Sequence, residues 1–260
     1  MVIAAPPVVN QPVTHLSDLR VLHEGEERWG ELRTKDGRNR ALLITAAPDA
    51  PPDPHIHPDF NEFWIMLDGE TEYQIGQYEP FKAKWGDVVI APCGFRHDIR
   101  STGRGPWNMR LVVGPQWSNH DIKGIEPSKL YPMPDADPPN LIHTSYEKML
   151  ERHGTATNWG EEVVLDQRNR VNFIHSLPGA SNNPHWHPDF DEWWVVLKGE
   201  LEWHVGKKEP FRAGSGDVVF VEKGYRHEII TVSDESAVRL AVTNRAGIHI
   251  FDGEEPAPKE

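Results

Sequence analysis

The sequence predicts an all-β protein built from two tandem domains, each a β-sandwich or β-barrel, with short flanking helices. One observation is a histidine and glutamate pattern that occurs twice in register, and the other is polar–apolar alternation typical of strands. The pattern comprises His55, His57, Glu62 and His97, and then His185, His187, Glu192 and His227. The differences 185−55, 187−57, 192−62 and 227−97 all equal 130, which indicates a duplicated domain.

The same offset extends beyond these residues and sets the expected division of the chain. Residues 29–31 read Trp-Gly-Glu, as do residues 159–161, and residues 86–89 read Gly-Asp-Val-Val, as do residues 216–219. We therefore expect five consecutive parts, namely an N-terminal arm (1–13), a first domain (14–113), a proline-rich linker (114–143), a second domain (144–250) and an acidic tail (251–260). The tail is expected to be solvated.

Each repeat has the pattern of strands joined by short turns. Leu201, Trp203 and Val205 alternate with polar residues, which is the period of a half-buried strand, and residues 71–75 do the same in the first repeat. Continuous apolar runs at 88–90 and 218–221 are typical of strands covered on both faces. Helix is limited to a short segment from Thr144 through His153 and its counterpart at 14–23.

Composition excludes several function classes. The chain has 260 residues, and its formal net charge of −13 argues against nucleic acid as a partner, because phosphate binding needs a basic face. No run approaches the roughly 20 apolar residues that cross a bilayer, so no membrane partner is expected. Cys93 is the single cysteine, which rules out an intrachain disulfide. A cytoplasmic location is the simplest interpretation.

The repeated residue types are metal ligands. A His-x-His pair on a strand places both imidazoles on one face, because side chains repeat every two residues. Three neutral imidazoles and one carboxylate suit a divalent transition metal, with up to two ions per chain. An octahedral ion would keep two positions free for water, dioxygen or a substrate oxygen, as a reactive site requires.

The spacing resembles the cupin superfamily. Its first motif, G(X)5HXH(X)3-4E(X)6G, is matched by Gly179, His185, His187, Glu192 and Gly199. The first repeat departs from it only at Asp49, which stands where the leading glycine would be. The second motif, G(X)5PXG(X)2H(X)3N, is matched by Gly86, Pro92, Gly94 and His97, with Ser101 in place of the asparagine. In the second repeat Gly216, Gly224 and His227 match, whereas Glu222 and Thr231 depart.

This resemblance implies a bicupin, that is, two tandem jelly-roll barrels in one chain. It implies that His55, His57, Glu62 and His97 bind one metal and that His185, His187, Glu192 and His227 bind another. Iron is the first expectation, with Mn, Ni, Zn or Co as alternatives. Two other arrangements stay open: one site occupied and the other vacant or structural, or barrels that have lost their metal.

Alternation also predicts residues of a substrate pocket. If Glu62 points inward, Trp64 and Met66 point the same way, as do Trp194 and Val196 in the second repeat. Tyr73 and Trp203 lie on the apolar faces of the following strands. Packing in the barrel core is the competing interpretation for all six. His175, which stands where the first repeat has Thr45, is a candidate acid or base of the second pocket, unless it faces outward.

Three functions follow from these expectations. The first is an Fe(II)-dependent dioxygenase-type enzyme acting on a small, oxygen-bearing, partly aromatic or apolar metabolite. The second is a non-oxidative metalloenzyme (decarboxylase, isomerase, lyase or hydrolase), which needs a general acid or base besides the ligands. The third is a module that binds a metabolite without turnover. The partner is a small-molecule substrate in each case, and assembly into a homo-oligomer is plausible.

Overall fold

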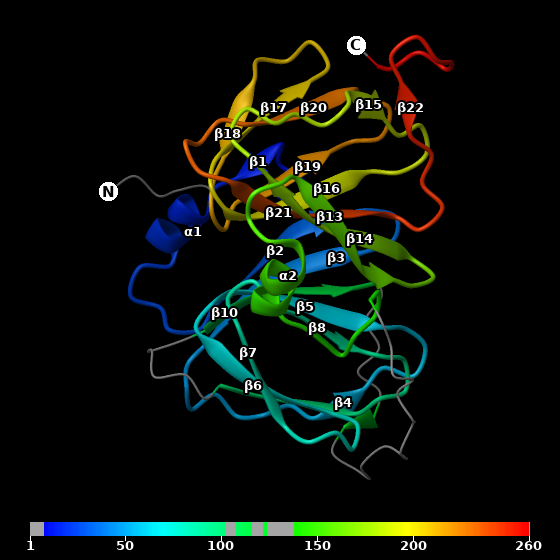
Figure 1. The fold of residues 1–260 in the computed structure, drawn as a ribbon. Coiled ribbons are helices and arrows are strands. Elements are labelled where there is room, and N and C mark those ends of the chain that lie inside the picture. The colour runs from blue at the N-terminus through cyan, green and yellow to red at the C-terminus, as the bar shows by residue number, and fades with distance from the viewer. Residues whose placement is uncertain (1–7, 102–107, 116–121, 124–137, 260) are drawn as a thin grey trace. The chain divides into compact units, whose positions relative to one another are not determined.

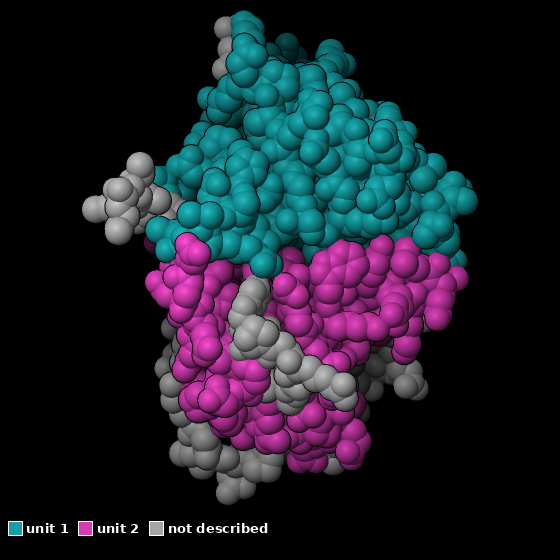
Figure 2. All heavy atoms as spheres, turned by 90° about the vertical axis from the view of Figure 1, so that its left-hand side faces the viewer, with its two compact units in different colours: residues 1–22, 152–260 teal, residues 23–151 magenta. Residues whose placement is uncertain are grey.

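A computed structural model describes residues 8–101, 108–115, 122–123 and 138–259. The chain divides into two compact units, which we call the first barrel (His23–Glu151) and the second barrel (Met1–Leu22 with Arg152–Glu260). Figure 2 colours the first barrel magenta and the second barrel teal. Strands dominate both, and the only helices among the described residues are α1 (Leu16–Leu22) and α2 (Tyr146–His153). The prediction of an all-β protein with short helices is therefore confirmed.

The first barrel consists of two antiparallel sheets that form two layers (Figure 1). One sheet contains, in spatial order, β12 (His143–Thr144), β8 (Val88–Ala91), β5 (Glu62–Asp68), β10 (Asn108–Gly114), β3 (Arg40–Ala46) and β2 (Gly30–Lys35). The other contains β11 (Ile122–Lys123), β4 (His55–Ile56), β9 (His97–Ser101), β6 (Glu70–Ile75) and β7 (Phe81–Lys84).

The second barrel repeats this arrangement. Its larger sheet contains β1 (Val13–Thr14), β19 (Val218–Val221), β16 (Glu192–Lys198), β21 (Ala237–Asn244), β14 (Asn169–Ser176) and β13 (Trp159–Leu165). Its smaller sheet contains β18 (Phe211–Ala213), β17 (Leu201–Val205), β20 (His227–Thr231), β15 (His185–Trp186) and β22 (Ile250–Phe251). The duplication seen in the sequence is thus a duplication of the fold.

The short segment at the start of each sequence repeat completes the barrel formed by the other repeat. Strand β1 pairs with β19 in the second barrel, and β12 pairs with β8 in the first. The expected division placed residues 14–22 in the first domain and residues 144–151 in the second. In the structure, residues 14–22 belong to the second barrel and residues 144–151 to the first. The physical reason is that β8 and β19 each have a free edge that a preceding segment covers.

A buried aspartate fixes each exchanged segment. Asp217 accepts hydrogen bonds from the backbone N–H of Leu16 (2.8 Å) and from Nδ1 of His15 (2.9 Å). In the first barrel Asp87 does the same for the backbone N–H of Tyr146 (3.0 Å) and Nε2 of His143 (2.9 Å). Each aspartate therefore caps the first turn of a helix, where backbone N–H groups have no partner within the helix.

The end of the chain is exposed, as expected, with only one partly buried residue between 251 and 259. It is nevertheless held to the second barrel by hydrogen bonds that the sequence did not predict. Strand β22 pairs with β15, the Trp186 indole N–H donates to the Pro256 carbonyl (3.1 Å), and the Lys259 backbone N–H donates to the Gly224 carbonyl (2.7 Å). The acidic composition of this segment concealed the backbone pairing that holds it.

Alternation places the core as the sequence predicts. In β6, Thr71, Tyr73 and Ile75 are fully buried, whereas the residues between them are partly exposed. In β5 and β16 nearly every residue is buried, because these strands are covered on both faces. None of the helices in the described part of the chain has the length and apolar character needed to span a bilayer.

Candidate metal centres

The first candidate centre lies where three strands of the first barrel come together. Strands β4 and β9 are antiparallel neighbours, and His55 pairs directly with His97 across them. Glu62 begins β5, and His57 follows β4 by one residue. One ligand atom from each of the four residues lies within 4.8 Å of the others, and all four side chains are buried. The sequence-predicted ligands of this site are thus brought together.

The spacing of the donor atoms fits a metal ion. Nε2 of His55 lies 3.2 Å from Nε2 of His57 and 3.0 Å from Nε2 of His97. Oε2 of Glu62 lies 3.3 Å from Nε2 of His57 and 3.5 Å from Nε2 of His97. Ligands about 2.1 Å from a common ion stand roughly 3 Å apart, so these donors surround a volume of the right size.

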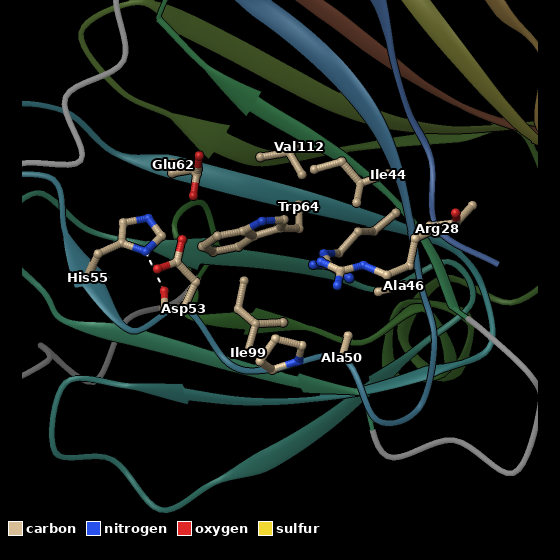
Figure 3. Close-up of a pocket in the computed structure, with 13 residues that line it drawn as sticks. Arg28, Ile44, Ala46, Ala50, Asp53, His55, Glu62, Trp64, Ile99 and Val112 are labelled. Atoms are coloured by element: carbon tan, nitrogen blue, oxygen red, sulfur yellow. Dashed lines mark hydrogen bonds between the residues drawn. The ribbon is translucent and has the colours of Figure 1, made fainter. Parts of the chain in front are cut away.

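The backbone orients the imidazoles toward that volume. Nδ1 of His55 donates to the Asp53 carbonyl (2.5 Å; Figure 3), and Nδ1 of His97 donates to the Phe95 carbonyl (3.4 Å). With the proton on Nδ1, the lone pair of each Nε2 points inward, which is the tautomer that a metal ligand needs. Three neutral histidines and one glutamate therefore fit a divalent metal ion.

The second barrel repeats this geometry with differences. His185 pairs with His227 across β15 and β20, and Oε2 of Glu192 lies 2.7 Å from Nε2 of His187 and 3.2 Å from Nε2 of His227. Nδ1 of each histidine again donates to a backbone carbonyl, those of Asn183, Ile248 and Tyr225. All four predicted ligands of this centre converge as well.

A fourth imidazole stands at the second centre. The ring of His249 lies 4.8 Å from that of His185 and 4.5 Å from that of His187, measured between centroids. Sequence reasoning missed this residue, because it lies outside the repeated His-x-His, Glu and His pattern from which the ligands were identified. It immediately precedes β22, whose pairing with β15 carries it to the site.

Burial sets the protonation of the ligands. It lowers the pKa of His97 to about 3 and that of His185 to about 4, so both imidazoles are neutral at neutral pH. Burial alone would raise the pKa of Glu62 and of Glu192, but the neighbouring histidines outweigh it and hold both carboxyl pKa values below the usual range. In each centre at least one imidazole is thus neutral and the carboxylate is ionised, which is the form of these groups that binds a cation.

A cavity of about 270 Å³ opens onto the first centre. His55 and Glu62 line one end, Arg28 stands at the other, and Trp64 lies between them (Figure 3). The remaining wall includes Ile44, Ile99, Val112, Asp53 and Arg110. Sequence reasoning identified only Trp64 among the residues that line it besides the ligands.

The other predicted pocket residues lie in core clusters. Met66 and Tyr73 are fully buried, and the Tyr73 hydroxyl donates to Sδ of Met66 (3.4 Å). Val196, Trp194 and Trp203 form the equivalent cluster of the second barrel. Trp64 and Trp194 each place their ring about edge-on to a ligand imidazole, 5.2 Å from His97 and 5.3 Å from His227. The two tryptophans therefore pack against the ligand imidazoles from the core clusters.

His175 is buried and lines a cavity of the second barrel. It follows Ile174, which pairs with Arg239 as the interior residue Val196 does, so His175 belongs to the opposite, outward face of β14. It is 1% exposed, stacks on Trp159 at 5.3 Å, and donates from Nδ1 to the Thr157 carbonyl (2.9 Å). Its Nε2 has no hydrogen-bond partner among the described residues. The cavity is also lined by Arg239, Ser176 and Asn182, but by none of the four ligands of the second centre.

Comparisons with known proteins agree with this architecture. The family model described as "Cupin domain" matches residues 42–114 and 172–243. Oxalate decarboxylase of Bacillus subtilis (strain 168) is 26% identical over 106 residues, which cover 36% of this chain and 28% of that protein. The chain therefore matches less than a third of the length of this relative.

Solved structures show the same fold. A cupin 2 conserved barrel domain protein from Leptotrichia buccalis aligns with a TM-score of 0.64 at 15% identity, covering 89% of this chain and 95% of the other. Oxalate decarboxylase from Bacillus subtilis, solved at pH 4.6, aligns with a TM-score of 0.58 at 15% identity, covering 95% and 79%. At such identities the likeness concerns the fold alone.

Proposed function

Because the chain belongs to the cupin domain family and carries two centres of three histidines and one glutamate, we propose that it is a metal-dependent enzyme acting on a small, oxygen-bearing metabolite. The observation that carries the proposal is the cavity of the first barrel, which reaches His55 and Glu62 directly. A centre with four protein ligands and a cavity in front of them leaves room for a substrate oxygen.

The first candidate reaction is of the dioxygenase type at Fe(II). Bound iron would provide the binding position for dioxygen, and the substrate that is oxidised would provide the electrons. The chain supplies an apolar wall of Ile44, Trp64, Ile99 and Val112, which excludes water and fits a partly aromatic or apolar substrate. This reaction requires no general acid or base beyond the ligands, and only one carboxyl that is not a ligand lines the cavity.

That carboxyl supports the second candidate, a non-oxidative reaction such as decarboxylation at Mn(II). Asp53 lines the cavity beside His55, so it is placed to give or take a proton, and the second repeat has Asn183 at the equivalent position. The partial match to an oxalate decarboxylase supports the same candidate. The proton function would then belong to the first barrel alone.

Metal analysis and a binding probe test the proposal. Tag-free protein is analysed for metal identity and content, then reconstituted anaerobically with Fe(II) and exposed to nitric oxide. We expect the EPR signal of nitric oxide bound to Fe(II) in the native chain and a weaker signal in E62A. Metal that binds without any such signal would indicate closed structural sites and contradict an enzymatic function.

Oxygen uptake and carbon dioxide release then separate the two reactions. Uptake of dioxygen with a substrate would support the first candidate, and release of carbon dioxide without net uptake would support the second. A metabolite that binds tightly at the first centre and is never converted would instead favour a binding module. The expectations of a cytoplasmic location and a homo-oligomer belong to this proposal and can be checked by fractionation and light scattering.

A further inference from the structure

Two arginines occupy equivalent inward-facing positions in the two barrels. Arg110 in β10 pairs with Met66 and Ile44, and Arg239 in β21 pairs with Val196 and Ile174. Residues directly opposite each other on neighbouring strands point to the same face of a sheet. Met66 and Val196 belong to the buried clusters of the barrel interiors, so both guanidinium groups also enter the interior.

Neither arginine has a carboxylate partner among the described residues. Nη1 of Arg110 donates to Oδ1 of Asn108 (2.7 Å), and Nη1 of Arg239 donates to Oγ of Ser176 (3.1 Å). The Nε atoms of both are buried without a hydrogen-bond partner in the described structure. A buried guanidinium N–H without a hydrogen-bond partner is costly, and an anionic ligand would supply that partner.

The two arginines differ in what else lines their cavities. Arg110 shares its cavity with His55 and Glu62, the ligands of the first centre, and with Arg28. Arg239 shares its cavity with none of the ligands of the second centre, and Asn158 stands there at the position equivalent to Arg28. The first-barrel cavity therefore joins the candidate metal centre to a guanidinium that has no carboxylate partner among the described residues, whereas the cavity of Arg239 does not reach a ligand.

Charge and shape both favour an anion in this cavity. A divalent ion with Glu62 carries a net charge of about +1, the guanidinium groups of Arg28 and Arg110 add two positive charges, and the Asp53 carboxylate removes one, so the cavity stays positive. A carboxylate matches the planar donor fork of an arginine. Between the arginine and the ligands the wall is apolar, with Ile44, Ile99 and Trp64. Such a wall fits a short apolar spacer between two oxygen-bearing ends.

We propose that the first barrel selects a substrate with a carboxylate, which Arg110 binds while a second oxygen of the same molecule faces the ligands His55 and Glu62. The proposal rests on the proposed function, because it takes the first centre as the place where substrate oxygen binds. It makes Arg110 the specificity-determining residue and makes the first barrel the substrate-binding half of the chain.

Calorimetric titration of Mn(II)-loaded protein with matched probes tests the proposal. The charged probes are 3-hydroxybenzoate and succinate, and their uncharged partners are 3-hydroxybenzamide and succinamide. Native protein is expected to bind each charged probe more tightly than its partner, with one equivalent per chain. R110Q and R110M should weaken the charged probes about 10- to 100-fold, as expected for loss of hydrogen bonds to a charged group, and leave the amides nearly unchanged. R110M preserves apolar packing if R110Q folds poorly.

R239Q is the matched control, and metal content and Tm are recorded for every variant. It should retain the preference for the charged probes. Loss of the preference in R239Q but not in R110Q, or equal binding of both members of each pair, would overturn the carboxylate site and leave the metal-dependent function standing. Binding of none of the four probes to metal-loaded protein would overturn both.

Discussion

His55 and His97 are direct partners across two antiparallel strands, and their Nε2 atoms lie 3.0 Å apart. Their equivalents, His185 and His227, are register partners in the same way. The distance between these two ligands is therefore set by the backbone ladder and not by loop conformation. A centre built on such a pair is organised before any ion arrives, which favours precise placement of a substrate oxygen.

The glutamate ligands should each control one ion. We expect E62A and E192A to lose roughly one metal ion per chain each, while the barrel stays folded, because each change removes the only anionic ligand of its centre. Elemental analysis with circular dichroism measures both effects. E79A, which changes an exposed turn residue, is the control. Full metal content in both ligand variants would show that the ligand sets are wrong.

Acid should destabilise the metal-free protein well above the pKa of its carboxylates. His97 and His185 have folded-state pKa values of about 3 and 4, mainly through burial, against an unfolded value of 6.5. The unfolded chain therefore binds more protons as pH falls below 6.5, and stability declines between about pH 6.5 and 4. Burial alone would lower the pKa of His187, but the hydrogen bond and charge of Glu192 outweigh burial and raise it. This raised pKa opposes the decline in part.

Differential scanning calorimetry in the presence of a chelator measures this dependence. Between pH 7 and pH 5 we expect Tm to fall by several degrees, and H97Q should show a shallower slope because one of the two groups is absent. A Tm that is constant or rises over this range would show that these imidazoles are not buried in the neutral form.

The exchanged segments should be sensitive to a single methyl group. Gly216 has a φ of +86°, and a Cβ there would overlap the side chain of Leu16 in α1. We expect G216A to cost at least about 3 kcal/mol, which combines backbone strain with overpacking. G154A is the matched control, since Gly154 has a φ of +71° with nothing within 4 Å, and should cost only about 1–2 kcal/mol. Equal costs in urea unfolding would contradict the contact with α1.

The capping aspartates should matter equally. D217A removes the acceptor for the Leu16 and Gly214 backbone N–H groups, and D87A removes the acceptor for those of Tyr146 and Lys84. Each is expected to lower the free energy of unfolding by about 1–3 kcal/mol. D49A, at an exposed position, should change it by less than about 0.5 kcal/mol. Urea midpoints of the three variants give the comparison, and a D217A midpoint close to that of D49A would argue against the cap.

The sequence allowed the fold and the ligand sets to be predicted because both depend on local spacing. A His-x-His pair and the alternation in β6 follow from the period of a strand, and the repeat doubled each observation. The cavity did not follow in the same way. Met66 and Tyr73 share the inward face with Trp64, but neighbouring side chains from other strands enclose them, and no local pattern records that.

Other features depend on contacts between distant residues. The orientation of Arg110 was ambiguous, since the repeat register slips by one after the last histidine, and its strand register settles that it points inward. The pairing of β1 with β19 joins residues more than 200 positions apart. His249 reaches the second centre only through β22, where composition indicated a tail.

The covering of β8 and β19 by segments from the other repeat has a consequence for the history of the chain. In a single ancestral repeat the barrel would have lacked one strand and one helix. Two copies would have completed each other's barrels by exchanging their N-terminal segments. Joining the copies in one polypeptide makes this exchange intramolecular, so it no longer depends on protein concentration. Neither half could then be lost alone, because each supplies a strand and a helix to the other barrel. The two metal centres lie outside these exchanged segments and could evolve different functions.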